Sequence, residues 1–136
     1  MANLEVKWDD EARVVRFNTF LGATLKRAKS GLVRAGFVVE RQIKKNLSGK
    51  RTPGNPYPGW VTTRLRTSVT SQASSDGMIV SIGPNVEYAA IHEFGGRTGR
   101  GGKTIIPARP YVKPAWKQSR TKIIDIMRKA VAGKAE

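Results

Sequence analysis

Residues 17–47, FNTFLGATLKRAKSGLVRAGFVVERQIKKNL, are the stretch that decides the fold. Apolar residues recur there every three or four positions, which is the spacing of one face of an α-helix. They are Phe17, Leu21, Leu25, Ala28, Leu32, Gly36, Val39, Ile43 and Leu47. Lysines and arginines fill many of the positions between them, so the opposite face is basic. The stretch therefore predicts one long amphipathic helix, which Ser48 and Gly49 end.

Downstream of this helix, two runs of alternating residues predict an antiparallel β-hairpin. The runs are residues 65–72 and 78–82, and the Asp-Gly pair between them is typical of a tight turn. Within residues 86–94, apolar residues recur at helical spacing, which predicts a short helix. Thr104–Ile106 suits a brief strand that Pro107 stops. The last helix has Pro114 in its first turn, where proline is tolerated. Its predicted apolar face comprises Trp116, Ile123, Ile124, Met127 and Val131.

These elements predict a single α+β domain over residues 1–136, a length that suits one domain. The order is a long N-terminal helix, an antiparallel β-hairpin or small sheet, a short helix, a glycine-rich loop and a C-terminal helix. We expect flexible loops near residues 49–59 and 95–103, and frayed residues at 132–136. Six aromatic residues near segment ends are expected to anchor a small core rather than to stack on bases. They are Tyr57, Trp60, Tyr88, Phe94, Tyr111 and Trp116.

The charge of the chain restricts its partners. Lysine and arginine total 25 against 10 acidic residues, a formal net charge of +15 that is spread over the whole sequence. Such a chain attracts polyanions or acidic protein surfaces. The absence of cysteine and the single histidine, His92, exclude a cysteine-ligated or multi-histidine metal site, and no cofactor is expected. No apolar run approaches the ~20 residues that cross a bilayer, so we expect no membrane partner.

The stretch GGRTGRGGKT, residues 95–104, looks like a phosphate-binding loop but does not fit that motif. The motif requires a glycine five positions before its Gly-Lys pair, and that position is Arg97. It also requires a following helix, which Pro107 prevents. Two interpretations remain: a flexible solvent loop, or a loop that becomes ordered against a partner. In the second, Arg97, Arg100 and Lys103 meet phosphates or carboxylates, and Lys50 and Arg51 in the preceding loop are expected to do the same.

A catalytic role is the least favoured interpretation. His92 and Glu93 are adjacent, and neighbouring helical residues point about 100° apart, so they do not make a natural dyad. A structural or interface histidine is the favoured interpretation, and a toxin-like nuclease that uses these two residues is the enzymatic alternative. The sequence predicts no enzyme.

Three pieces of the chain, in this order and spacing, resemble a known family. They are Gly59-Trp60 followed by LRTS at residues 65–68, YAAIHEFGG at residues 88–96, and IPARPYV at residues 106–112. They are similar to tailed-phage head–tail connection proteins, namely the virion morphogenesis or tail-completion group and the related neck proteins. The resemblance covers about residues 30–131.

The resemblance implies a structural virion protein that forms a ring, commonly sixfold, at the junction of the DNA-filled head and the tail. It implies head-completion or connector proteins and tail-tube proteins as neighbours, location in the virion, and the host cytoplasm during assembly. It implies no catalysis. The matching motif residues are expected to be scaffold: Arg109 pins the start of the last helix, and Tyr88 and Phe94 seat the short helix, together with Trp60 and Tyr111.

Two alternatives stay open. A neck role and a tail-completion role share much of the pattern. The net charge and the glycine-arginine loop also suit a non-specific nucleic-acid-binding domain, and phosphate contact of this kind, including contact with genomic DNA in a ring lumen, would be independent of base sequence.

Overall fold

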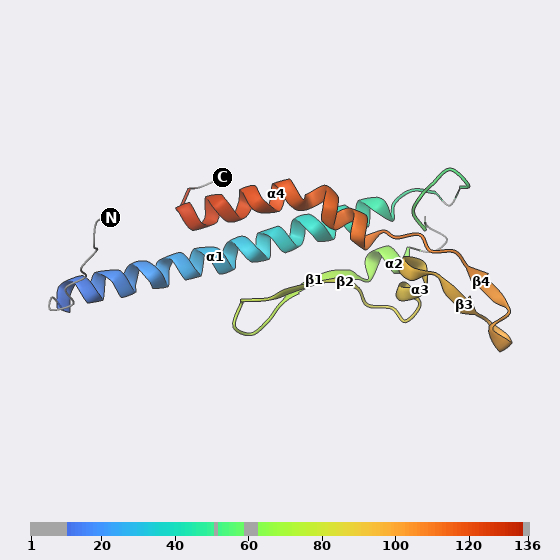
Figure 1. Ribbon diagram of the computed structural model, residues 1–136, viewed down its shortest axis with the longest axis horizontal. Coiled ribbons are helices and arrows are strands. Elements are labelled where there is room, and N and C mark those ends of the chain that lie inside the picture. Colours follow the sequence, from blue (N-terminus) through green and yellow to red (C-terminus); the bar gives the residue numbers. More distant parts are fainter. Residues whose placement is uncertain (1–10, 51, 59–62, 135–136) are drawn as a thin grey trace, which may run out of the picture.

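The computed structural model describes residues 11–50, 52–58 and 63–134, with side chains from Thr19 onward. Its elements are α1 (Glu11–Asn46), α2 (Arg64–Thr67), β1 (Val69–Ala73), β2 (Val80–Pro84), α3 (Ala89–Phe94), β3 (Gly96–Thr98), the 3-10 turn η1 (Arg100–Gly102), β4 (Thr104–Ile106) and α4 (Val112–Ala132). Helix α1 lies between α4 on one side and the β1–β2 hairpin on the other, and β3–β4 projects at the end where α4 begins (Figure 1). The predicted α+β class is confirmed. Trp60 and Arg51 lie outside the described residues.

The apolar face of α1 is buried only along its C-terminal half. Val39, Ile43 and Leu47 are buried, whereas Leu21 and Leu25 are 47% and 46% exposed. The reason is the length of α4, because Gly133, which follows its last residue, already lies beside the guanidinium of Arg27. The part of α1 that precedes Arg27 therefore extends beyond α4 (Figure 1).

Helix α4 packs on α1 through small side chains, which the predicted apolar face did not include. Its buried residues are Ala115, Ser119, Ile126 and Ala130. Of the predicted face, Ile123 and Met127 are half-buried, but Trp116, Ile124 and Val131 are 53%, 41% and 46% exposed. The prediction was wrong for these three because the face that meets α1 is formed by three small residues and Ile126, and the three large side chains lie outside it. At Gly31 of α1, a Cβ atom would stand 2.5 Å from the Cβ atom of Ala130.

This close approach predicts a large difference between two glycines of the same helix. Gly31→Val is expected to lower the free energy of unfolding by about 1–2 kcal/mol, because the added atoms force α1 and α4 apart. Gly22→Val is the matched control: nothing lies within 4 Å of its Cβ position, so the change is expected to stay within about 0.5 kcal/mol. Urea unfolding of the two variants measures both values, and equal losses at the two sites would contradict the packing described here.

The first hairpin is present, but its first strand begins later than predicted. Strands β1 and β2 are antiparallel, with Val69 opposite Pro84 and Ala73 opposite Val80. Residues 64–67 form the helical turn α2 instead of strand. The Thr67 hydroxyl donates to the carbonyl oxygens of Thr63 and Arg64, and such local hydrogen bonds compete with strand pairing.

The glycine-rich segment contains a second antiparallel ribbon. Gly96 lies opposite Ile106 and Thr98 opposite Thr104, so the strand predicted at Thr104–Ile106 is confirmed and its partner strand β3 was missed. Gly95, which follows α3, has φ of 71°, and a Cβ atom there would stand 2.7 Å from the backbone nitrogen of Ala108. A side chain at this position would push apart the two chain segments that begin the ribbon.

The core lies at one end of the molecule, where the C-terminal half of α1 meets the other elements. It consists of Val39, Ile43, Leu47, Leu65, Val69, Ala89, Tyr111 and Ala115. None of the helices in the described part of the chain is long and apolar enough to pass through a lipid bilayer.

Candidate interaction surfaces

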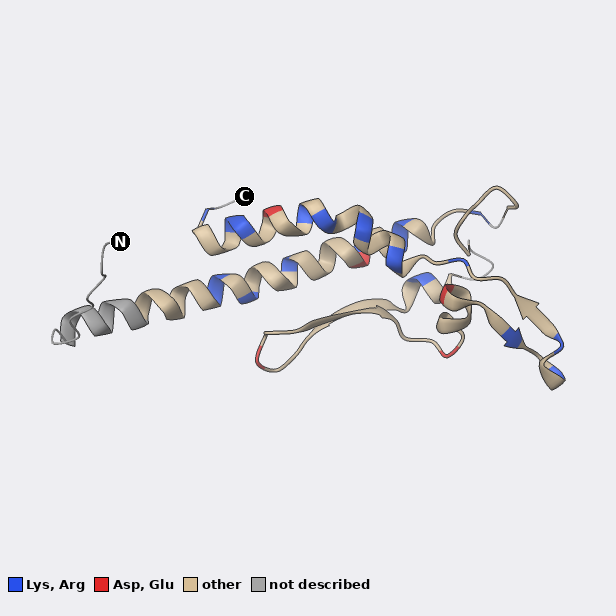
Figure 2. Ribbon diagram, viewed as in Figure 1, with Lys and Arg blue, Asp and Glu red and all other residues tan. Residues whose placement is uncertain are grey.

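Three of the predicted contact residues lie together at the tip of the β3–β4 ribbon. Arg97 is on β3, Arg100 is in η1 and Lys103 directly precedes β4, and all three are exposed. Figure 2 shows this basic tip at the end of the molecule opposite the N-terminus of α1. The structure thus presents the glycine-arginine segment as a basic projection carried by paired strands.

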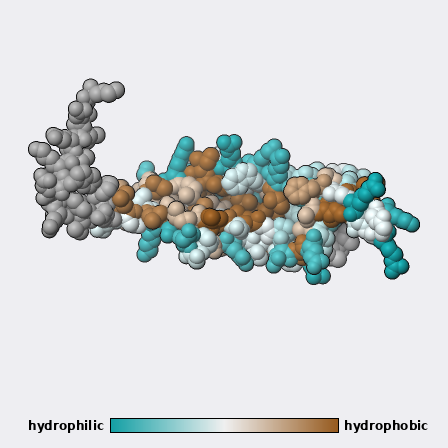
Figure 3. Space-filling view, turned by 60° about the horizontal axis from the view of Figure 1, so that its bottom comes forward, coloured by the Kyte–Doolittle hydropathy of each residue, from teal (hydrophilic) through white to brown (hydrophobic). Residues whose placement is uncertain are grey.

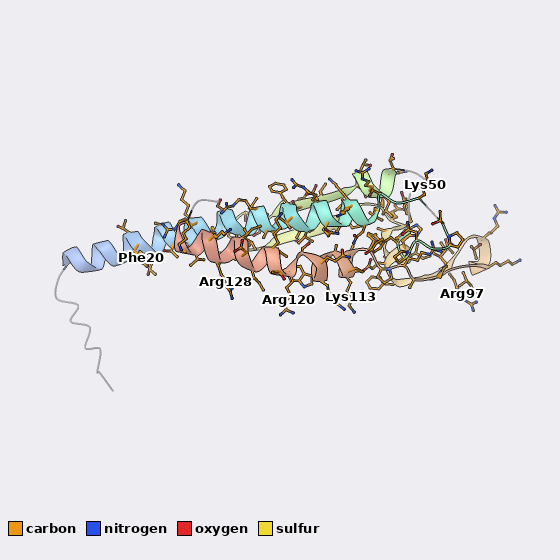
Figure 4. The ribbon with its side chains drawn as sticks, turned by 90° about the horizontal axis from the view of Figure 1, so that it is seen from above. Phe20, Lys50, Arg97, Lys113, Arg120 and Arg128 are labelled. Atoms are coloured by element: carbon orange, nitrogen blue, oxygen red, sulfur yellow. The ribbon has the colours of Figure 1, made fainter. Side chains whose placement is uncertain are left out.

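Lys50 does not join the basic tip. It is exposed in the loop after α1, where its carbonyl oxygen accepts a hydrogen bond from Asn55 Nδ2 at 2.8 Å. Figure 4 shows Lys50 and Arg97 on opposite sides of the molecule. The predicted set of contact residues is therefore divided between two surfaces, and Arg51 lies outside the described residues.

A further basic surface, which was not among the predicted contact residues, follows the outer face of α4. It consists of the exposed residues Lys113, Lys117, Arg120 and Arg128. Lys113, Arg120 and Arg128 extend toward the same side of the molecule as Arg97 (Figure 4). Their spacing of seven and eight residues places them on one face of a helix, which is the signal that would have found them.

One acidic residue on each of the two long helices forms an ion pair. Asp125 forms an ion pair with Lys129 at 2.9 Å. Glu40 forms one with Lys44 at 2.6 Å and accepts a hydrogen bond from the Ser71 hydroxyl. Burial opposes ionisation of Glu40, but these hydrogen bonds outweigh it and lower the pKa of its carboxyl. On α4, Asp125 is therefore already paired, whereas Glu40 faces the β1–β2 hairpin.

An apolar groove of about 560 Å³ lies between β2, α3 and the first turns of α4. Ile82, Val86 and Ala90 line it together with Phe94 and Trp116. Phe94 is 80% exposed and Trp116 is 53% exposed. Phe94 was predicted to seat the short helix, and Trp116 to pack in the core. The structure instead presents both rings to solvent along the groove.

Tyr111 forms the floor of the groove. Its side chain is fully buried, and its hydroxyl donates to the carbonyl oxygen of Ala89 in α3 at 3.1 Å. Tyr111 therefore holds α3 against the start of α4. Tyr88, by contrast, is 37% exposed and its ring lies edge-on to the His92 ring, with centroids 5.9 Å apart.

Glu93 caps the N-terminus of α4, a role that the sequence interpretation missed. Its Oε2 atom accepts hydrogen bonds from the backbone N–H groups of Tyr111 at 2.7 Å and Val112 at 3.0 Å, and Oε1 accepts one from Lys113 at 3.1 Å. Arg109, predicted to pin this helix start, contributes its backbone N–H to the His92 carbonyl oxygen at 2.9 Å. A carboxylate at a helix N-terminus satisfies N–H groups that have no partner within the helix. Glu93 thus has a structural function in this chain.

The burial of Tyr111 predicts a loss of stability in alkali. Burial, with the negative charge of Glu93 as a second cause, raises the pKa of Tyr111 to about 12. In the unfolded chain the phenol ionises near pH ~10, so the folded state holds this proton more tightly. The stabilisation is complete below pH ~10 and is lost as the pH rises toward ~12, by about 1.4 kcal/mol per pH unit. Unfolding free energies at pH 9 and 11 measure it, and Tyr111→Phe is expected to remove this component; an unchanged pH dependence in that variant would contradict the assignment.

Among the residues that the structure describes, no three histidine or acidic side chains come together where an ion could be held.

Comparison with known proteins places these features in a family. Residues 21–132 match the phage virion morphogenesis family. The chain is 51% identical over 51 residues to the Mu-like prophage FluMu G protein 2 of Haemophilus influenzae, which covers 38% of this chain and 36% of that protein. It is 32% identical over 90 residues to an uncharacterized protein of Methanocaldococcus jannaschii, covering 66% of this chain and 62% of that protein. The chain thus spans less than two thirds of the length of either relative.

No solved structure matches the chain. The family match covers most of the sequence, from α1 to the end of α4, and includes the basic tip, the groove and the Glu93 cap. This chain belongs to the phage virion morphogenesis family.

Proposed function

We propose that this chain is a ring-forming subunit at the head–tail junction of a tailed phage particle, as a neck or a tail-completion protein. Family membership supports a role in building the virion, structural rather than catalytic. The prophage relative in Haemophilus influenzae supports a phage origin. The position at the junction and the ring are the parts that we propose.

The observation that carries the proposal is the apolar surface that the isolated subunit leaves exposed. Phe20, Phe37, Phe94 and Ile105 are 60%, 54%, 80% and 70% exposed, respectively. Figure 3 shows a band of hydrophobic surface along one face of the molecule, with hydrophilic side chains on both flanks. Extended apolar patches of this kind mark surfaces that become buried against other proteins. A subunit that is completed by its neighbours fits such a surface.

The basic surfaces supply the contacts beyond the ring. In this proposal the tip formed by Arg97, Arg100 and Lys103 meets an acidic surface of a neighbouring head or tail protein, or phosphates of DNA in the lumen. The tip lies on a short two-stranded ribbon that projects from the body (Figure 1). Contacts with phosphate would depend on charge and not on base sequence.

Electron microscopy of particles tests the proposed function. Purified virions are expected to show a ring of this subunit between head and tail, and particles made without the gene are expected to accumulate as filled heads and separate tails. Restoring the gene in trans is the control and should restore joined particles. Absence of the protein from purified virions, together with normal joining in the deletion, would refute the proposal.

A second candidate function, a non-specific nucleic-acid-binding domain, is favoured by one observation. Arg97, Lys113, Arg120 and Arg128 extend to the same side of the molecule (Figure 4), on a chain of net charge +15. Gel-shift titration of duplex DNA across salt concentrations tests it. Tight binding that persists near physiological salt, with a steep salt dependence, would favour this function, and binding that vanishes there would exclude it.

A further inference from the structure

We infer that the part of α1 that extends beyond α4, residues 11–26, occupies the apolar groove of a second copy of this chain. We call this part the α1 extension. The inference rests on the proposed ring and identifies the interface that builds it. Its occupant is a neighbouring copy of the same subunit, which docks head to tail.

Three apolar side chains that the structure describes in the α1 extension are exposed in the isolated subunit. Phe20, Leu21 and Leu25 are 60%, 47% and 46% exposed, and they fall within one side of the helix at about 100° per residue. Helix α4 ends beside Arg27 and the β1–β2 turn reaches α1 at Lys29, so the neighbouring elements stop before the extension begins. Figure 4 shows Phe20 beyond the end of α4.

The groove offers the complementary surface. It is open, apolar and rimmed by Phe94 and Trp116, which are more than half exposed. An amphipathic helix commonly binds a protein by placing apolar side chains three or four positions apart into such a groove. Leu21 and Leu25 have this spacing, and Phe20 lies beside them.

Charge favours the extension as the occupant of the groove. Glu87 lines the groove, is exposed and makes no hydrogen bond or ion pair with another described residue. The α1 extension carries three basic residues and one acidic residue, a formal charge of +2; they are Arg13, Arg16, Lys26 and Glu11. The groove lining also contains Glu93 and Lys113, so its formal charge is −1, opposite in sign to that of the extension. Contact between two α1 extensions would instead bring like charges together.

The placement of the two surfaces determines the kind of assembly. Figure 1 shows the α1 extension at one end of the molecule and α3 and the first turns of α4, which line the groove, toward the other, so one chain cannot bring them together. They also differ from each other, so their association is head to tail. Contacts of this type produce a ring when the rotation between copies closes, and an open filament when it does not.

Engineered disulfides test the inference, because the natural chain has no cysteine. Full-length chains carry Phe20→Cys, Phe94→Cys or both, and all are oxidised after assembly, in solution and in purified particles. The double variant is expected to give a ladder of covalent dimers, trimers and larger species. An equal mixture of the two single variants is expected to stop at dimers. Each single variant alone should give at least about ten-fold less dimer, because a disulfide requires α-carbons within about 7 Å.

Matched controls keep the result interpretable. A mixture of Phe20→Cys and Arg120→Cys tests the extension against the outer face of α4. It should give no more covalent dimer than either single variant alone. Phe20 and Phe94 are exposed, so neither variant empties the core, and circular dichroism confirms that each is folded. Dimers from Phe20→Cys alone would overturn the inference, since they indicate two-fold contact. The inference would also be overturned if the cysteine at position 20 formed cross-links only with a different virion protein.

The outcomes separate this inference from the proposed function. A ring seen in particles without the cross-link between positions 20 and 94 would leave the ring intact and refute this interface. The cross-linked ladder in a protein that builds only open filaments, and is absent from the head–tail junction, would support the interface and refute the proposed function.

Discussion

Tyr111→Ala is expected to lower the free energy of unfolding by about 3–5 kcal/mol, the cost of removing a fully buried aromatic ring and leaving its cavity. The ring is 0% exposed and belongs to the core cluster, to which α1, α4 and the elements between them all contribute. Its hydroxyl also satisfies the carbonyl oxygen of Ala89. Removal of the side chain therefore loses packing and leaves a buried acceptor unpaired. Chemical unfolding monitored by circular dichroism measures the change.

Two variants separate the contributions of Tyr111. Tyr111→Phe keeps the ring and removes only the hydrogen bond, so it is expected to cost about 1 kcal/mol. Tyr88→Ala is the matched control on a tyrosine that is 37% exposed, and a smaller loss of about 1–2 kcal/mol is expected there, because this ring is only partly buried and its removal leaves no enclosed cavity. A loss at Tyr88 equal to that at Tyr111 would show that the core does not centre on Tyr111.

The sequence predicts the framework of this fold because periodicity reports which faces are buried. The helical spacing of Val39, Ile43 and Leu47 identifies the buried half of α1, and the Asp-Gly turn identifies the first hairpin. The same spacing continues through Leu21 and Leu25, which are exposed. Periodicity cannot distinguish a face that packs within the chain from one that is left for a partner.

Other features depend on contacts between distant segments, and sequence reasoning missed them for that reason. The face of α4 that packs on α1 consists mainly of small residues such as Ala115 and Ala130, whereas hydropathy selects large ones such as Trp116. The ribbon β3–β4 pairs Gly96 with Ile106 across a glycine-rich segment that has no strand propensity of its own.

The candidate surfaces were predictable in part. The basic residues at 97, 100 and 103 were identified from composition, and the structure places them on one tip. The groove could not be identified, because its lining comes from β2, α3 and α4, which lie far apart in the sequence. Phe94 and Tyr111 both belong to the family motifs, yet Phe94 is exposed and Tyr111 is buried. Only the fold decides this difference.

Glu93→Ala is expected to lower the free energy of unfolding by about 2–3 kcal/mol, because one carboxylate satisfies three backbone N–H groups at the start of α4. Glu87→Ala is the matched control: this acid is exposed on the same groove and has no partner among the described residues, so a change within about 0.5 kcal/mol is expected.

The two glutamates should also differ in their effect on assembly, which makes the comparison sharper than stability alone. Without its cap, the first turn of α4 frays, and the groove loses the wall formed by Val112 and Trp116. Glu93→Ala is therefore expected to weaken both folding and the cross-link between positions 20 and 94, whereas Glu87→Ala is expected to weaken the cross-link while folding stays unchanged. Urea unfolding and cross-linking yield measure the two effects on the same preparations. Equal stability of the two variants would contradict the capping role of Glu93, and full cross-linking in Glu87→Ala would contradict the contribution of charge to the interface.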